Sequence, residues 1–267
     1  MGKLFGVVVT LIALASAAIF ALHVWWLPPD ISTHGARIDR QLNETMVVAG
    51  VLFVLAQLSL AAFVWRASET RLPRPIKIFP GGATPMVVVA SVLVGFEILV
   101  LTFVGSKLWA DVYQTSPARG ALQIEVQAEQ FAYYFRYAGK DGKFGAMHPE
   151  MMSDANENFF GLDPANDTTA RDDIVVASLV IPVNQPILLQ MHAKDVNHSF
   201  YVPALRIQQD FVPGMIIPLH FTATTPGKYE LVCTQLCGLG HYQMRAYVEV
   251  KTQADFAAWL KQKEAES

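Results

Sequence analysis

Charged side chains are scarce in this chain of 267 residues, since Asp, Glu, Lys and Arg together make up 16% of it. Soluble domains usually carry about 25%, and the formal net charge here is only −3. Disorder and nucleic-acid binding are therefore disfavoured. The chain has two cysteines, too few for a disulfide scaffold. What it has in excess is apolar residues, 52% of the total, and this composition indicates a membrane protein.

Long apolar runs occur only before Lys107. Three of them, near residues 4–27, 45–65 and 86–106, are long enough to cross a bilayer as helices. Among Asp, Glu, Lys and Arg, only Glu97 lies inside these runs. An ionisable group at that depth serves either a proton path or helix packing. We expect a membrane anchor over 1–111 and an extracytoplasmic domain over 112–267.

The loop charges predict the orientation of the helices. The second loop contains more basic than acidic residues, with Arg66, Arg71, Arg74 and Lys77 against Glu69. The positive-inside rule places this loop in the cytoplasm and the C-terminal domain outside.

The first apolar run has two interpretations. Lys3 followed by an apolar stretch and Ala15-Ser16-Ala17 is typical of a cleavable signal peptide. The run continues to Trp25-Trp26, however, which suits a retained helix anchored at the interface.

The residues after Lys107 predict β structure. Leu122, Ile124, Val126 and Ala128 alternate with polar residues, as in a half-buried strand. The polar segment 139–173 is expected to be a long excursion, and Thr252 is expected to cap a C-terminal helix. Short strands separated by Pro-Gly turns indicate an all-β sandwich or barrel. Further strands are predicted over 174–181, 186–193, 216–222, 229–233 and 243–250.

The part of the chain from Lys107 onward is mildly acidic, with 13 basic and 18 acidic residues. This excess indicates either an ordinary solvated surface or a face that steers a basic partner.

Both cysteines, a histidine and a methionine gather within twelve residues, in the spacing Cys233-x3-Cys237-x3-His241-x2-Met244. Thiolate, imidazole and thioether are ligands that suit copper. The segment lies between two predicted strands, whose rigid ends can fix the direction of each ligand. His198, expected in a loop after a strand, is the candidate for a second histidine.

Four kinds of site fit these residues. Structural zinc would leave Met244 unexplained, and a blue-copper site would leave Cys237 surplus. A Cys233–Cys237 disulfide would suit an oxidising compartment. Two thiolates bridging a pair of copper ions would use every residue, together with the carbonyl of Gln235.

Two segments resemble cytochrome c oxidase subunit II, namely Asp195–Pro203 with Gln209–Gly214 following it, and then Cys233–Met244. The resemblance implies a cupredoxin fold with a dinuclear CuA centre of two copper ions. The ligands it implies are the bridging Cys233 and Cys237, the terminal His198 and His241, the weak axial Met244 and the carbonyl of Gln235.

The resemblance also implies partners and a location. Electrons would pass from cytochrome c or a similar donor to haem in the catalytic subunit I, which would itself reduce oxygen. The chain would then be a multi-pass protein of a bacterial-type cytoplasmic membrane, with its soluble domain on the periplasmic side.

The sequence departs from the family at several positions. The family usually has a glutamate between the cysteines that helps to hold magnesium, so Gln235 puts a magnesium site in doubt. Phe131 stands where an electron-entry tryptophan is common. A proton-uptake carboxylate often begins the last membrane helix, but Met86 or Val87 occupies that place here, and Glu97 lies deeper. The family commonly has two membrane helices, not three.

Two other functions stay open. A CuA subunit of a nitric oxide reductase would not need the same carboxylate. A periplasmic copper-binding or copper-delivery protein would need no catalytic partner. Quinol oxidase subunits of the same fold lack the copper ligands, so both cysteines disfavour that assignment.

Overall fold

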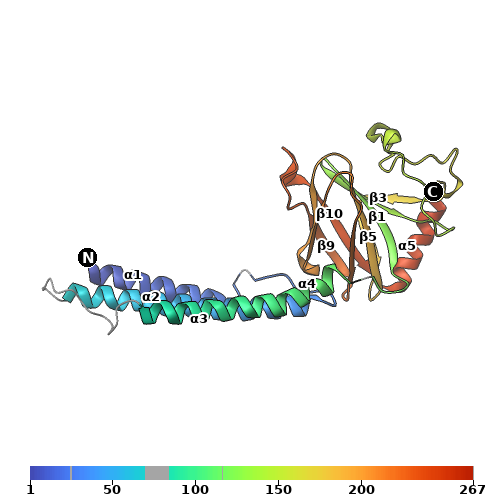
Figure 1. Ribbon diagram of the computed structural model, residues 1–267. Helices are drawn as coiled ribbons and strands as arrows, with labels where there is room; N and C mark the ends of the chain where they lie inside the picture. Colours follow the sequence, from blue (N-terminus) through green and yellow to red (C-terminus); the bar gives the residue numbers. More distant parts are fainter. Residues whose placement is uncertain (25, 70–83, 116, 267) are drawn as a thin grey trace. The chain divides into compact units, whose positions relative to one another are not determined.

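The computed structural model describes residues 1–24, 26–69, 84–115 and 117–266 (Figure 1). It forms two compact units. One consists of Met1–Trp26 and Arg37–Trp109, and the other of Leu27–Ala36 and Ala110–Ser267. Four residues used above to place the membrane segments lie outside the described residues: Trp25, Arg71, Arg74 and Lys77.

The first unit is built from long apolar helices. They are α1 (Gly2–Ala21), α2 (Gly35–Glu69) and α3 (Thr84–Val100), and α3 continues through a π-helical turn η1 (Leu101–Gly105) into α4 (Ser106–Tyr113). All three spans are long and apolar enough to cross a membrane, so the three predicted helices are confirmed. α2 and the span from α3 to α4 extend beyond the predicted apolar runs, because the added residues 35–44, 66–69 and 107–113 contain no proline. The first helix, predicted near 4–27, ends earlier, at Ala21.

The second unit contains two five-stranded sheets. Their strand orders are β3-β2-β1-β5-β8 and β4-β10-β9-β6-β7. A continuous cluster of buried apolar side chains, including Phe200, Phe211 and Leu231, fills the space between them. The expected all-β cupredoxin-like sandwich is therefore confirmed. The first sheet contains β3 (Ile174–Val176), β2 (Ala132–Tyr137), β1 (Leu122–Glu129), β5 (Pro186–Ala193) and β8 (Ile217–Thr222). The second contains β4 (Leu179–Pro182), β10 (Arg245–Lys251), β9 (Gly227–Val232), β6 (His198–Val202) and β7 (Ile207–Phe211).

The observed strands match the predicted strands where the pattern of apolar and polar residues is regular. β1 and β5 have the predicted bounds, and β8, β9 and β10 differ by one or two residues. The run 174–181 was wrongly predicted as one strand. It crosses from one sheet to the other, so that β3 pairs with β2 and β4 pairs with β10. The strands β2, β6 and β7 were not predicted.

The polar excursion covers one face of the first sheet. It contains three short 3-10 helices, η2 (Pro149–Met151), η3 (Asp154–Asn156) and η4 (Thr168–Ala170). The polar residues of β1, which alternation predicted to face water, are buried: Glu125, Gln127 and Glu129. The half-buried prediction for β1 was therefore wrong, because segment 139–173 supplies a cover that the local pattern does not reveal.

Arg136 joins that cover to the sheet. Its guanidinium is fully buried, 3.0 Å from the Glu125 carboxylate and 2.8 Å from Asp173. It also donates to the carbonyl of Gly145 and lies over the ring of Phe160. Burial raises the pKa of both Glu125 and Asp173, and the charge of Arg136 opposes that rise. The cation therefore keeps two carboxylates together under the excursion.

Two more segments complete the second unit. The helix α5 (Gln253–Glu266) begins as expected, since the Asp255 backbone N–H donates to Thr252 Oγ1 over 3.1 Å. The link between α1 and α2 packs on the sandwich through the buried Ile31. Its backbone N–H donates to the carbonyl of Ala204 over 2.9 Å, and its carbonyl accepts from the N–H of Thr224 over 2.7 Å. Ala204 lies in η5 (Pro203–Leu205).

We expect Arg136→Met to lower the free energy of unfolding by about 3–5 kcal/mol, because it leaves two buried carboxylates without their cation. Thermal and denaturant unfolding of the full chain in detergent, followed by circular dichroism, would measure the loss. Lys261→Ala, at an exposed position on α5, is the control and should cost little. A loss below about 1 kcal/mol for Arg136→Met would contradict this role.

Candidate metal centre

The candidate centre lies at one end of the sandwich, where four connections between strands meet. The strand registers bring together segments 130–131, 194–197, 212–216 and 233–244. The last of these closes on itself at its base, because the Cys233 backbone N–H donates to the Met244 carbonyl over 3.2 Å. The adjoining residues Val232 and Arg245 are paired across β9 and β10. The loop ends are therefore fixed by the sheet.

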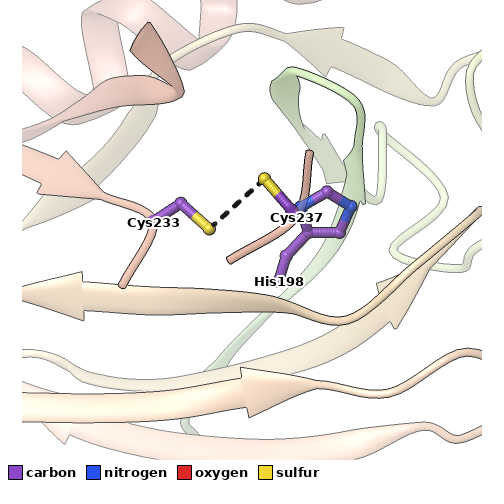
Figure 2. A group of neighbouring side chains, drawn as sticks. All are labelled: His198, Cys233 and Cys237. Atoms are coloured by element: carbon purple, nitrogen blue, oxygen red, sulfur yellow. Dashed lines mark hydrogen bonds between the residues drawn. The ribbon is translucent and has the colours of Figure 1, made fainter. Parts of the chain in front are cut away.

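The predicted ligands converge inside this loop. Figure 2 shows His198 beside the two cysteines, whose sulfur atoms are 3.9 Å apart. Cys237 Sγ lies 3.6 Å from His241 Nδ1 and 3.7 Å from Met244 Sδ. Met244 Sδ is in turn 3.2 Å from His198 Nδ1. The donor atoms of His198, Cys233 and Cys237 all lie within 4.8 Å of one another.

The sixth predicted ligand is a backbone atom. The carbonyl oxygen of Gln235 lies 3.1 Å from Cys233 Sγ. The six candidates thus form one connected group, in which His198 and Cys237 are buried, at 0% and 3% exposed, and Gln235 and His241 are half-buried. His198 differs from expectation in one respect, since it is the first residue of β6 instead of a loop residue.

The two thiols have unequal acidity. Burial raises the pKa of Cys233, but hydrogen bonds from His198 and from the Ser199 backbone outweigh it and lower the value to about 6. Burial and the neighbouring Cys233 charge raise the pKa of Cys237 to about 11. A second thiolate therefore requires a positive charge between the sulfur atoms, which a bound metal would supply.

The orientation of His198 is fixed by a carboxylate. Its Nε2 lies 2.8 Å from Asp195 Oδ1. Asp195 also accepts from the backbone N–H groups of Gln130, over 2.8 Å, and Val196, over 2.7 Å. A carboxylate that accepts from Nε2–H leaves Nδ1 of the neutral ring with a lone pair, which can bind a metal beside the sulfur atoms. Sequence reasoning missed this role, although Asp195 lies only three residues before His198.

Phe131 packs against the loop. The loop has glycines at 238 and 240, and a Cβ atom on Gly240 would lie 2.5 Å from the Phe131 ring. Gly238 has φ +138°, a conformation that favours glycine. Phe131 is 38% exposed, so this predicted electron-entry residue borders both the loop and solvent. Glu97, the other candidate residue, is half-exposed on α3 in the first unit, just before η1.

The donor set favours copper among the predicted alternatives. A thioether contributes little to structural zinc but is a normal copper ligand, and Met244 points into the group. Cys237 is part of the group, so it is not surplus as a blue-copper site would require. Both cysteines are free. Two thiolates, two imidazoles, one thioether and one carbonyl fit a pair of soft metal ions.

Comparisons with known proteins agree on one family. Residues 125–251 match the family model described as cytochrome c oxidase subunit II, periplasmic domain. The alternative cytochrome c oxidase subunit 2 of Bradyrhizobium diazoefficiens is 32% identical over 257 residues, which cover 96% of this chain and 90% of that protein. Cytochrome c oxidase subunit 2 of Cereibacter sphaeroides is 24% identical over 242 residues, which cover 88% and 78%.

A solved structure is also similar. The crystal structure of the periplasmic domain of subunit II of cytochrome oxidase from Bradyrhizobium japonicum covers 57% of this chain and 99% of its own, at 24% identity and a TM-score of 0.42.

We expect Asp195→Ala to weaken copper binding by about 10- to 100-fold, because the His198 ring loses the group that orients it. Competition of the full chain with a copper chelator would measure the affinity. Asp210→Asn, near the end of β7, is the control, since the Asp210 carboxylate accepts from the Gln208 side chain over 3.4 Å. An unchanged affinity in Asp195→Ala would show that β6 alone orients the histidine.

Proposed function

The chain belongs to the cytochrome c oxidase subunit II family, and from this premise we propose that it is the electron-relay subunit of a haem-copper terminal oxidase. In this proposal it holds a dinuclear CuA centre, accepts electrons from cytochrome c or a similar donor and passes them to haem in the catalytic subunit I. Oxygen reduction belongs to that partner subunit, so this chain is part of an enzyme without itself holding catalytic residues.

The observation that carries the proposal is that all six candidate ligands form one connected group around the two cysteines. Cys233 and Cys237 would bridge two copper ions, His198 and His241 would bind one each, and Met244 and the Gln235 carbonyl would complete the set. The bound pair would supply a carrier of one electron. The protein contributes a loop tied at its base and a histidine held by a carboxylate, which limit movement of the ligands.

The same geometry disfavours a copper-delivery protein. Such a protein must release its metal, which calls for accessible ligands. Here His198 and Met244 are almost completely buried, at 0% and 2% exposed. A closed ligand set suits a resident cofactor. The choice between oxygen and nitric oxide belongs to the partner subunit, and the relatives named as oxidases favour oxygen.

Gln235 does not favour magnesium. The side chain at this position is an amide, which lacks the negative charge that hard cations prefer. Its carbonyl is retained beside Cys233. We therefore propose two copper ions and no magnesium contribution from residue 235.

The membrane unit supports an anchoring role. Its three helices present apolar side chains outward, and no residue of α3 is buried within the described chain. We propose that these helices contact lipid and subunit I in a bacterial-type cytoplasmic membrane, with the sandwich on the periplasmic side. Glu97 precedes a π-helical turn, a feature often found at functional sites, and it would serve a proton path or a packing contact there.

Copper loading of the full chain in detergent tests the proposal. We expect two copper ions per chain, a purple colour and electron paramagnetic resonance hyperfine structure from two equivalent nuclei. A blue single-copper spectrum, or a colourless protein that prefers zinc, would contradict it.

Single substitutions separate the ligand roles. Cys233→Ser or Cys237→Ser should abolish the dinuclear site, because a bridging thiolate has no substitute. Met244→Leu should keep two copper ions but shift their reduction potential, since an axial ligand tunes the site more than it holds the metal. Complete loss of copper in Met244→Leu would contradict the axial assignment.

The donor surface near the loop is apolar. The four connections at this end carry only two charged residues, Lys194 and Asp195, and both are paired within the domain. The exposed side chains there include Leu239 at 98% and Tyr242 at 81%. Glu129 and Asp154 lie beside this end, both bonded to Lys194, so the loop surface itself is what lacks an acidic excess.

We expect reduction of the copper-loaded chain by cytochrome c to change less than about twofold between low and physiological salt, where the Debye length is about 8 Å. Stopped-flow rates would measure this dependence. Leu239→Glu is the comparison, because an added carboxylate should make the rate with a basic cytochrome c salt-dependent. A steep fall with salt in the unaltered chain would show that acidic residues elsewhere steer the donor.

A further inference from the structure

One glutamine contacts two different parts of the candidate centre. Gln130 directly follows β1, a strand that pairs with β2 on one side and β5 on the other. Its backbone N–H donates to Asp195 Oδ2 over 2.8 Å, and its side-chain amide donates to the carbonyl of Cys237. The same residue therefore reaches the carboxylate that orients His198 and the main chain of a candidate bridging cysteine.

The first contact acts on His198 through Asp195. Asp195 Oδ2 accepts from the backbone of Gln130, while Oδ1 of the same carboxylate lies 2.8 Å from His198 Nε2. The neighbouring backbone is paired as well, since the Lys194 N–H donates to the Ala128 carbonyl over 3.0 Å. The segments that follow β1 and β5 therefore stay side by side, and the carboxylate between them keeps its orientation.

The second contact acts on the backbone at Cys237. The next residue, Gly238, has φ +138°, a conformation that favours glycine. A Cβ atom on Gly238 would lie 2.7 Å from the amide nitrogen of Gln130, so the loop packs directly on this amide. The bond between Cys233 and Met244 at the base of the loop joins residues of the loop itself. The bond from Gln130 instead ties Cys237 to the end of a strand in the first sheet.

We propose that Gln130 is a positioning residue of the copper centre, which fixes the bridging Cys237 relative to the terminal ligand His198. This inference rests on the proposed function. Groups that hold metal ligands from outside control the affinity and the electronic properties of a site. His241 belongs to the same loop as Cys237 and would move with it, whereas His198 lies on β6 and would not. Loss of the bond from Gln130 therefore changes the surroundings of one copper ion more than those of the other.

The first variant is Gln130→Leu, which removes the side-chain donor and leaves the backbone bond to Asp195 in place. The test uses the full chain in detergent, loaded with copper. We expect the variant to keep two copper ions but to transfer them to a chelator about two- to tenfold faster, the size of one ordinary hydrogen bond. The hyperfine structure of its paramagnetic resonance spectrum should no longer come from two equivalent nuclei. This second readout separates positioning from a simple loss of affinity.

The strand β1 offers a matched control. Gln123, near its start, is also an exposed glutamine, and its side chain accepts from the Gln190 amide over 3.4 Å. Gln123→Leu should leave the rate of copper transfer and the spectrum as in the unaltered chain. Because both glutamines are exposed, neither substitution should change the thermal unfolding of the copper-free chain appreciably.

A second variant separates hydrogen bonding from packing. Gln130→Glu keeps the length of the side chain but replaces the donor by a carboxylate, which cannot donate to the Cys237 carbonyl. Its added charge would attract copper, so the spectrum is the deciding readout, and it should again show two unequal nuclei.

Three results would overturn the inference. The first is two equivalent nuclei in either Gln130 variant that binds two copper ions. The second is an equal change in Gln123→Leu. The third is loss of copper from both Gln130 variants, since a positioning residue only tunes the site. If the unaltered chain itself fails to bind two copper ions, the proposed function fails before this inference is reached.

Discussion

Two sulfur atoms held 3.9 Å apart in a nearly closed pocket impose the main constraint on this protein. Both cannot be ionised there at neutral pH without a positive charge between them, as the opposed pKa shifts of Cys233 and Cys237 indicate. The sandwich nevertheless keeps them together, because the loop is tied at its base by Cys233 and Met244. The fold thus maintains an arrangement that a bound metal would complete.

The groups around the ligands come from parts of the chain that only the sandwich brings together. Asp195 follows β5 and Gln130 follows β1, yet Asp195 contacts His198 and the Gln130 side chain donates to the Cys237 carbonyl in the loop after β9. On the other face of the first sheet, Arg136 holds the excursion against β1 and keeps these strands covered. A rigid sheet therefore supports a site made of loops, and a site that changes shape little suits a relay of electrons.

The sequence predicted what depends on local pattern. Strict alternation predicted β1, and a compact apolar run predicted β5. The close spacing from Cys233 to Met244 predicted most of the candidate site. Prediction from the sequence failed where packing between distant parts of the chain determines the structure. Ile174–Ile181 is continuous in composition but crosses between sheets, and β2 contains a buried arginine that breaks the apolar pattern of a core strand. Asp195 was missed as a partner of His198 although the two are close in sequence, and the contact of Gln130 with the Cys237 carbonyl was missed because it arises only after strands from both sheets have packed.

The charged residues of the domain meet two requirements, which are solubility of the whole domain and fixed orientation of the groups at the candidate site. The domain is acidic as a whole, which favours solubility. Its charged residues near the candidate site are instead engaged in fixed contacts: Lys194 with Glu129 and Asp154, and Asp195 with His198. What remains exposed around the loop is apolar, including Leu239 and Tyr242. An apolar loop surface, with the nearest charges held in contacts within the domain, lets a partner approach the loop closely without displacing the groups that orient His198.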